Sequence, residues 1–208
     1  MDEYKIFARI YDPVLHAVLH KIRKKVVGVV QQYNPSSIID ICCGTGNQLK
    51  YLKRSGFYHV TGIDLSRSML QQTEKGKEKV KCDEQDATEL KFQDNSFDLG
   101  IISFALHEKP YEVARKIIDE ARRVIQPDGH LIVVDYTFEN KPRYPVKTAI
   151  RIVERFAGKD HHRHFKHYIS YGGMNKLLKN FNLEKEYRFH GGATSLRVYQ
   201  VEQTGHYA

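Results

Sequence analysis

The segment IIDICCGTGNQL, residues 38–49, most constrains what this chain can fold into. Its isoleucine-rich beginning is typical of a strand that is covered on both faces. Gly44 and Gly46 then allow positive φ angles and leave room for a ligand against the backbone. Asn47 can cap a helix that follows the turn. In parallel sheets, ligands bind beyond the carboxyl ends of the strands, so this segment predicts a ligand-binding turn.

Strand and helix patterns alternate after this turn. Such alternation predicts a doubly wound, mainly parallel sheet with helices on both faces, a Rossmann-like three-layer α/β/α fold. The last two strands are joined through Gly191-Gly192, too short for a parallel crossover, so we expect the seventh and last strand to be antiparallel. The expected strands are 38–43, 59–64, 80–86, 97–106, 130–136, 183–189 and 195–202, and the helices between them are 47–55, 66–75, 111–125 and 173–181.

Two segments lie outside this alternation. Residues 1–33 include an apolar helical stripe from about residue 15 and predict an N-terminal helical cap. Residues 137–170 contain two prolines, a helix expected at 146–157 and a histidine-rich stretch, which predict a helical lid inserted over the ligand edge of the sheet. We expect one domain, residues 1–208.

The net charge of +8 is concentrated in these same two segments. Residues 141–166 carry eight Lys or Arg against two acids, and residues 1–32 carry six against three. This excess could favour an anionic substrate, nucleic acid or an acidic membrane surface, although solvated helix faces are the simpler explanation. No apolar run is long enough for a membrane span, no secretory signal is visible, and three cysteines fit a reducing compartment, so we expect a cytoplasmic protein.

Three acids follow the first three expected strands at intervals of about one strand–helix–strand unit. They are Asp40, Asp64 and Asp86. In a parallel sheet, this register directs them toward one crevice, where a carboxylate after the second strand can accept both ribose hydroxyls of a nucleoside. Taken singly, Asp64 could instead cap the helix at 66, and Asp86 could be a turn residue.

These segments resemble the motifs of the class I S-adenosylmethionine (SAM)-dependent methyltransferases. IIDICCGTGNQL is similar to their first motif and GIDLSRSML to the second, and DATELKFQDNSFDLGIISFALHE and RVIQPDGHLIVVDY are similar to those that follow. The resemblance covers about residues 36–136 and is to the ubiquinone/menaquinone C-methyltransferase-like subgroup (methyltransferase type 11). FARIYD at 7–12 also resembles the N-terminal segment of that subgroup.

The resemblance implies SAM as the cofactor and S-adenosylhomocysteine (SAH) as the product. It implies that the turn from Cys42 to Gly46 lies against the methionine part of SAM, with Ser103 facing that end and Tyr11 closing over it. It also implies that Asp64 binds the ribose. The remaining implied cofactor contacts are Asp40 in the first motif, Leu65 and Met69 beside the adenine, and Asp86 and Ala87 at its amine.

The glycine turn departs from two patterns. Cys42 stands where the family usually has glycine, and a pair of reactive thiols, Cys42 and Cys43, is an alternative interpretation. The third glycine of the dinucleotide motif is missing after Gly46, which favours SAM over a nicotinamide cofactor because SAM has no pyrophosphate.

Methyl transfer needs an aligned nucleophile and a dry site, so no fixed catalytic residue is expected. His107, after the fourth strand, is the candidate general base or substrate contact. In the histidine-rich stretch, His164 and Tyr168 share a helix face and are candidate substrate contacts. We expect no metal site, because no nearby carboxylate or cysteine in the sequence completes a ligand set with these histidines.

The sequence thus predicts methyl transfer from SAM to a small or medium-sized acceptor. The acceptor could be anionic, or it could be phenolic or quinone-like, and transfer to O, N or C remains open. The rival functions are an RNA or other macromolecule methyltransferase, a non-catalytic SAM- or SAH-binding module, and a nicotinamide-dependent Rossmann protein. The oligomeric state is also open.

Overall fold

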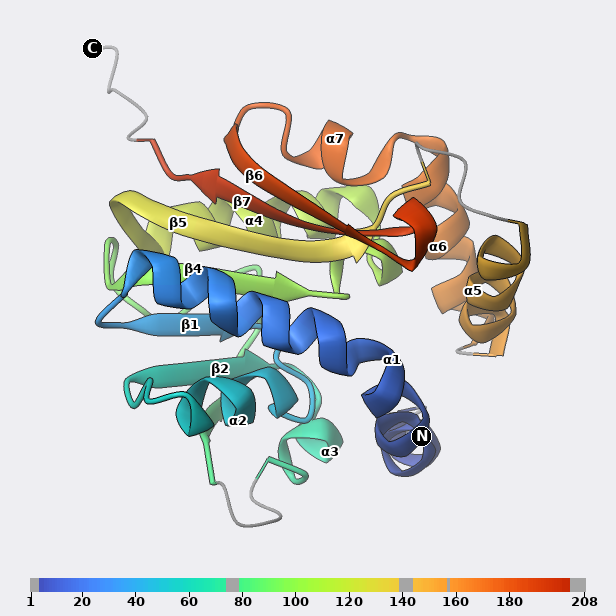
Figure 1. Ribbon diagram of the computed structural model, residues 1–208, viewed down its shortest axis with the longest axis horizontal. Coiled ribbons are helices and arrows are strands. Elements are labelled where there is room, and N and C mark those ends of the chain that lie inside the picture. The colour runs from blue at the N-terminus through green and yellow to red at the C-terminus, as the bar shows by residue number, and fades with distance from the viewer. Residues whose placement is uncertain (1–3, 74–78, 139–143, 157, 203–208) are drawn as a thin grey trace.

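The computed structural model describes residues 4–73, 79–138, 144–156 and 158–202. The side chains of residues 4–18 and of positions 144, 145, 147, 149, 153 and 156 lie outside this description. Figure 1 shows one twisted sheet between two layers of helices, with a helical pair beside the edge to which most strand arrows point.

The sheet has seven strands in the order β3-β2-β1-β4-β5-β7-β6. β1 to β5 are parallel neighbours, whereas β7 runs antiparallel to both β5 and β6. The predicted mainly parallel, seven-stranded Rossmann-like sheet with an antiparallel last strand is therefore confirmed. The strands are β1 (Ile38–Ile41), β2 (Val60–Asp64), β3 (Lys81–Glu84), β4 (Phe97–Ser103), β5 (Ile125–Tyr136), β6 (Asn182–Phe189) and β7 (Thr194–Gln200).

Helices cover both faces of the sheet. α1 and α2 lie on the face toward the viewer in Figure 1, and α4 lies behind β5. The helices are α1 (Tyr4–Tyr33), α2 (Asn47–Arg54), α3 (Arg67–Leu70), α4 (Tyr111–Val124), α5 (Tyr144–Phe156), α6 (Lys159–Ser170) and α7 (Gly173–Leu177), with 3₁₀ turns η1 (Leu106–Glu108) and η2 (His190–Gly192).

The core consists of two layers that the strands separate. Along β1, Ile39 and Ile41 pack into the layer beneath α4, whereas Ile38 packs into the layer beneath α1 and α2. This alternation follows from the pleat, which directs successive side chains to opposite faces. Because both faces are buried, the central strands are mainly apolar, as the isoleucine-rich segment at 38–41 predicts, with Asp40 as a buried exception in β1.

Several elements are shorter than the sequence predicts: the helix expected at 173–181 is α7 (Gly173–Leu177), and the strand expected at 80–86 is β3 (Lys81–Glu84). Of the helix expected at 66–75, α3 covers 67–70 and residues 71–73 form a turn, because the N–H groups of Gln72 and Thr73 bond to carbonyls three residues back; residues 74–75 lie outside the described part. The strand expected to reach residue 106 ends at Ser103, because Phe104 has a φ of 55° and leaves the extended conformation. The chain then turns into η1.

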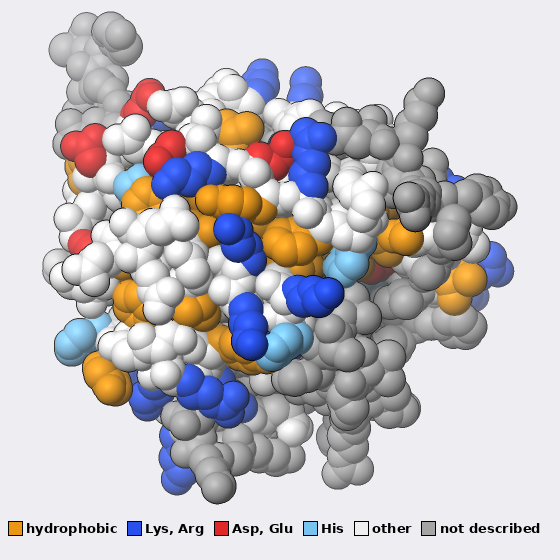
Figure 2. Space-filling model, viewed as in Figure 1, with side chains coloured by type: hydrophobic (Ala, Val, Ile, Leu, Met, Phe, Trp, Pro, Cys, Tyr) orange, Lys and Arg blue, Asp and Glu red, His pale blue; other side chains and the backbone are white. Residues whose placement is uncertain are grey.

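The two segments that carry the excess positive charge fold into the N-terminal helix α1 and the lid helices α5 and α6. α5 and α6 lie beside the carboxyl edge of the parallel strands, and the amino-terminal end of α1 lies at the same edge (Figure 1). Figure 2 shows Lys and Arg side chains spread among apolar groups over the α1 face. Lys25 packs with its Nζ 3.8 Å from the ring centroid of Tyr187 on this face.

Among the described residues, no helix has the length and apolarity needed to cross a membrane.

Candidate active site

The turn after β1 is built from residues with left-handed backbone. Cys42, Gly44 and Gly46 have φ angles of 60°, 56° and 67°. A Cβ added to Gly44 would meet no described atom within 4 Å, so the backbone there is open to a ligand. A Cβ on Gly46 would lie 3.0 Å from the Thr73 methyl, so this glycine is needed for close packing. The turn is therefore open beside Gly44 and closely packed beside Gly46.

Asp64 joins the end of β2 to this turn. Its Oδ2 accepts a hydrogen bond from the Gly44 N–H at 2.8 Å, and its Oδ1 accepts one from the Ser66 N–H at 2.8 Å. Burial raises the pKa of Asp64, although these two backbone donors act against the rise. Ser66 itself caps α3 through Met69 N–H. Asp64 thus fixes the turn while its carboxylate stays at the edge of the crevice.

The other two acids of the predicted register have different environments. Asp40 lies within β1 with 2% of its surface exposed, and burial raises its pKa well above the usual range. Asp86 is exposed, and its Oδ1 accepts hydrogen bonds from both the N–H and the hydroxyl of Thr88 at 2.8 Å, which lower its pKa. Asp86 therefore has the turn geometry considered as its alternative, and an adenine contact for it stays a prediction.

Three further features of this edge suit a nucleoside cofactor. Leu65 follows β2 directly and is 68% exposed, so its side chain is accessible to a ligand beside the turn. The Ser103 hydroxyl, at the end of β4, is buried and has no hydrogen-bond partner among the described residues. Buried polar groups are normally paired, so this hydroxyl lacks the partner that a ligand would provide. Met69 on α3 is half-buried, and Ala87 is buried. Tyr11 lies in the part of α1, residues 4–18, whose side chains are outside the description.

The cysteines do not form the pair considered from the sequence. Cys42 packs against the layer beneath α4, and Cys43 packs against the opposite layer. The Cys43 thiol instead donates to the Cys82 sulfur on β3 at 3.8 Å. This bond and burial raise the pKa of Cys43, while the same bond lowers that of Cys82. The interpretation of Cys42 and Cys43 as one reactive pair is therefore wrong, because adjacent residues point to opposite faces.

His107 lies in a buried cluster of charged side chains beyond β4 and β5. Its Nδ1 is 2.7 Å from Oδ1 of Asp135, and its Nε2 is 3.5 Å from Oε2 of Glu154. The other oxygen of Asp135 accepts the backbone N–H groups of Leu106 and His107. Burial alone would lower the pKa of His107, but Asp135 and Glu154 together raise it well above its usual range.

The lid completes this cluster from α5 and α6. His161 Nε2 lies 2.5 Å from Oε2 of Glu154, and His161 Nδ1 lies 3.4 Å from Oε2 of Glu108 on η1. The remaining oxygen of Glu154 accepts the Tyr136 hydroxyl at 2.9 Å. The expectation that no carboxylate completes a set with the histidines is wrong, because the fold brings Glu154 and Glu108 to His161.

Sequence reasoning missed the carboxylates of this cluster. Asp135 is the penultimate residue of β5 and Asp64 is the last residue of β2, so an acid near a strand end was a signal that could have found it. Glu154 is one of only two acids in a strongly basic segment, which was a weaker signal. Glu108 follows His107 directly in the sequence, but no spacing or motif marked it as a partner of the histidine-rich stretch.

The two predicted substrate residues on α6 are held in the lid. Tyr168 is fully buried, and its hydroxyl donates to the Tyr136 carbonyl at 3.2 Å. His164 is half-buried, with Nδ1 3.0 Å from the Glu108 carbonyl oxygen. Both side chains therefore fasten α6 to the ends of β5 and η1. Their contact with a substrate stays a prediction.

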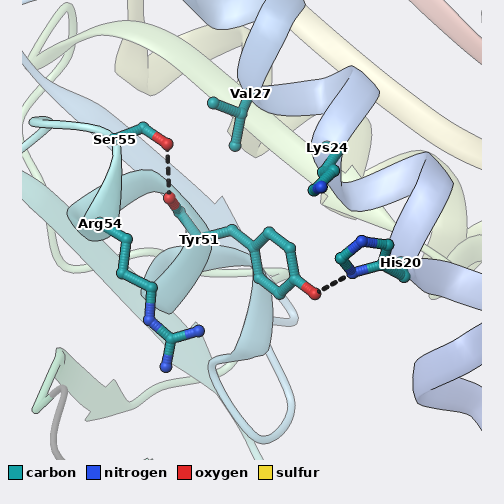
Figure 3. A pocket seen from close by; sticks show the side chains of 6 residues that line it. All are labelled: His20, Lys24, Val27, Tyr51, Arg54 and Ser55. Atoms are coloured by element: carbon teal, nitrogen blue, oxygen red, sulfur yellow. Dashed lines mark hydrogen bonds between the residues drawn. The ribbon is translucent and has the colours of Figure 1, made fainter.

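A separate pocket of about 330 Å³ lies between α1 and α2. Figure 3 shows its lining, in which the Tyr51 hydroxyl points toward His20, with 2.6 Å between the oxygen and Nδ1. Lys24 and Arg54 make it basic. None of the predicted site residues lines this pocket, and it adjoins the end of α2 opposite the glycine turn.

Comparison with known proteins matches the same region. Residues 39–133 match a family model described as a methyltransferase domain. A demethylmenaquinone methyltransferase of Listeria welshimeri is 31% identical, covering 86% of this chain and 84% of the relative. The chain belongs to the class I SAM-dependent methyltransferases, of the quinone C-methyltransferase-like type. These matches confirm the family and the cofactor, SAM, that the sequence predicts.

Two further relatives add to this picture. A demethylmenaquinone methyltransferase of Staphylococcus aureus is 39% identical to this methyltransferase over 61% of the chain, and the match spans only 53% of that relative. Several curated relatives are thus matched over about half of their length. The crystal structure of a SAM-dependent methyltransferase from Methanosarcina mazei has a TM-score of 0.59 at 20% identity, covering 84% of this chain and 97% of that one, a likeness of fold.

Proposed function

We propose that this methyltransferase transfers the methyl group of SAM to a ring carbon of a quinol-type acceptor. The observation that carries the proposal is the alignment with a demethylmenaquinone methyltransferase over 84% of that relative's length, which includes the glycine turn and the strand-end acids. An RNA acceptor and a non-catalytic SAM- or SAH-binding role are the rivals that the test below addresses.

The cofactor site proposed here is the edge formed by the turns after β1, β2 and β4. Asp64 accepts the ribose hydroxyls, because its carboxylate is already fixed by Gly44 and Ser66. Ser103 gives its unpaired hydroxyl to the methionine end, and Leu65 with Met69 covers the adenine. We include Asp40, Cys42, Gly46, Asp86, Ala87 and Tyr11 in the same site, as the family resemblance implies.

Aromatic side chains near the end of β5 support a planar acceptor. Tyr136 and Phe138 stack with 15° between their planes, and Phe104 and Phe165 meet Tyr136 edge to face. Such rings attract a flat, electron-rich ring without fixing its substituents. The lid helices α5 and α6 adjoin these residues, so we propose that residues 137–170 exclude water from the acceptor.

The reaction breaks the sulfur–methyl bond of SAM and forms a carbon–carbon bond at the ring. The ring then loses the proton from that carbon, and a hydroxyl proton must leave earlier for the ring to become nucleophilic. The cofactor supplies the methyl electrophile. Both nitrogens of His107 face carboxylates, one of Asp135 and one of Glu154. We therefore propose that His107 serves as general base or acceptor contact together with these two carboxylates, and not as an isolated base. His164 and Tyr168 position the lid in this proposal.

Methyl transfer from labelled SAM to three acceptors tests the proposal. The acceptors are a reduced 2-prenyl-1,4-naphthoquinone, a simple monophenol and a mixed RNA. We expect ring methylation of the naphthoquinol, detected by mass spectrometry together with an equal amount of SAH. Labelled RNA or phenol with an unmodified naphthoquinol would contradict the proposed acceptor. SAM binding with no product from any of the three would favour the non-catalytic alternative.

A His107→Gln variant tests the acceptor side separately from the cofactor side. We expect kcat to fall while the Kd for SAM stays unchanged, because His107 belongs to the cluster with Asp135 and Glu154 and not to the glycine turn. An equal loss of SAM affinity would show that His107 supports the cofactor site instead.

A further inference from the structure

The cluster between η1, β5 and the lid has a feature that methyl transfer does not require. Three ligand-type atoms face one another: Nε2 of His107, Nε2 of His161 and Oε2 of Glu154. One such atom from each of these residues lies within 4.8 Å of the others. His107 and Glu154 are buried and His161 is nearly so. The three residues come from η1, α5 and α6, so the fold and not a local sequence pattern brings them together.

In each of these three side chains, the second nitrogen or oxygen, which faces away from the other two side chains, also has a partner. Nδ1 of His107 contacts Asp135 at 2.7 Å, and Nδ1 of His161 contacts Glu108 at 3.4 Å. The second oxygen of Glu154 accepts the Tyr136 hydroxyl. Metal-bound histidines characteristically give their other nitrogen to a carboxylate, which fixes the ring and its tautomer. His107 has that arrangement through its hydrogen bond to Asp135, and the Nδ1 of His161 faces the Glu108 carboxylate at 3.4 Å, while the Nε2 atoms of both rings face Oε2 of Glu154.

The charges of the cluster also suit a cation. Metal binding displaces the proton from Nε2 of His107, and with both imidazoles then neutral, the carboxylates of Asp135, Glu154 and Glu108 outweigh the Lys109 ammonium, which pairs with Glu108 at 2.7 Å. The excess is two negative charges, and a divalent ion would cancel it. Buried charges are costly unless they are paired or bound to a metal.

We propose that His107, Glu154 and His161 form a site for a divalent transition-metal ion of the Zn²⁺ type. Two imidazoles and one carboxylate are a ligand set that such ions accept, and a fourth position stays available for water or another oxygen. Ligands about 2.1 Å from a tetrahedral ion lie roughly 3.4 Å apart. The 3.5 Å between His107 and Glu154 matches this spacing. The 2.5 Å between His161 and Glu154 is a hydrogen bond, so the ion replaces that shared proton.

The site joins the lid to the sheet. η1 follows β4, whereas Glu154 and His161 belong to successive lid helices. An ion bound to all three would hold α5 and α6 over the carboxyl edge. This inference stands on the geometry of the cluster and does not depend on the proposed quinol acceptor.

Metal titration of the full chain tests the inference without an activity assay. Protein stripped with a chelator and dialysed is titrated with ZnCl₂ in a calorimeter, and a thermal melt is recorded with and without the metal. We expect one saturable Zn²⁺ per chain and a higher Tm with Zn²⁺. Glu154→Gln and His161→Ala should each abolish the saturable uptake. Glu108→Gln, which removes an outer partner, should weaken it by about 10- to 100-fold.

His167→Ala is the matched control, because His167 lies on the same helix and its ring packs against Tyr171 outside the cluster. It should bind Zn²⁺ like the unaltered protein. Should a cluster variant fail to fold, Co²⁺ added to the unaltered protein still decides, because bound Co²⁺ with imidazole ligands gives strong visible absorption. No saturable Zn²⁺ uptake and no such Co²⁺ absorption, or uptake unchanged in both ligand variants, would overturn the site.

Discussion

Gly62 in the middle of β2 offers a sharp test of how the cofactor turn is supported. It pairs with Asp40 of β1 and Cys82 of β3. A Cβ added here would lie 2.5 Å from Leu49 Cδ1 and 2.8 Å from the sulfur atoms of both Cys43 and Cys82. Real Cβ atoms do not approach so closely, so the Gly62→Ala variant must displace α2 or the thiols.

The magnitude follows from two opposing effects. Overpacking a well-filled core costs about 1–3 kcal/mol. Replacing glycine by alanine returns about 0.4–1 kcal/mol because the unfolded chain has less freedom. We therefore expect Gly62→Ala to lower the free energy of unfolding by about 1–2 kcal/mol, which is roughly 2–8 °C in Tm for a chain of this size. Urea unfolding followed by circular dichroism measures this loss.

Gly28→Ala is the matched control, because an added Cβ there meets no described atom within 4 Å in the interior of α1. It should stabilise the protein by about 0.5–1 kcal/mol, the helix preference for alanine. In the double variant Gly62→Ala with Cys82→Ala, one close contact is absent, so part of the loss, about 0.5 kcal/mol or more, should be recovered. A Gly62→Ala protein as stable as the unaltered one would refute this packing.

Three further predictions concern the cofactor turn. Asp64→Ala should weaken SAM binding by about 1–3 kcal/mol in calorimetry, since buried hydroxyls lose a charged acceptor, whereas Asp83→Ala on β3 should not. Cys42→Gly should leave the Tm unchanged or raise it slightly, and SAM binding should be retained. The reason is that the left-handed backbone at Cys42 costs a non-glycine residue about 1–2 kcal/mol. A clear drop in Tm would contradict this. SAM affinity should fall on acidification as Asp64 gains a proton, and because burial raises its pKa, the fall should begin at a higher pH than for an exposed aspartate. Asp64→Asn should show no such step in a pH series of calorimetric titrations.

The cofactor half of the site could be predicted from the sequence because its signals are local. The glycine turn follows its strand directly, and Asp64 ends the next strand in the chain. Parallel pairing of β1 with β2 then brings the Asp64 carboxylate to Gly44. The antiparallel β7 was also predictable, because a connection as short as the one through Gly191-Gly192 allows only a hairpin.

The lid cluster could not be predicted in the same way. Glu154 meets His107 across 47 positions, and no periodic pattern in the sequence connects them. Only the packing of α5 and α6 against η1 brings the cluster together. The pairing of Cys43 with Cys82 was hidden for the same reason, since it needs β3 beside β2 and a glycine between the two thiols.

The central claim is that the edge beyond β1, β2 and β4 binds SAM through the glycine turn and Asp64. Calorimetry of the full chain with SAM, SAH and NAD tests it most directly. We predict that SAM and SAH each bind with one site per chain, that NAD shows no binding, and that Asp64→Ala weakens both adenosyl ligands. Binding of NAD with no heat from either SAM or SAH would contradict the claim.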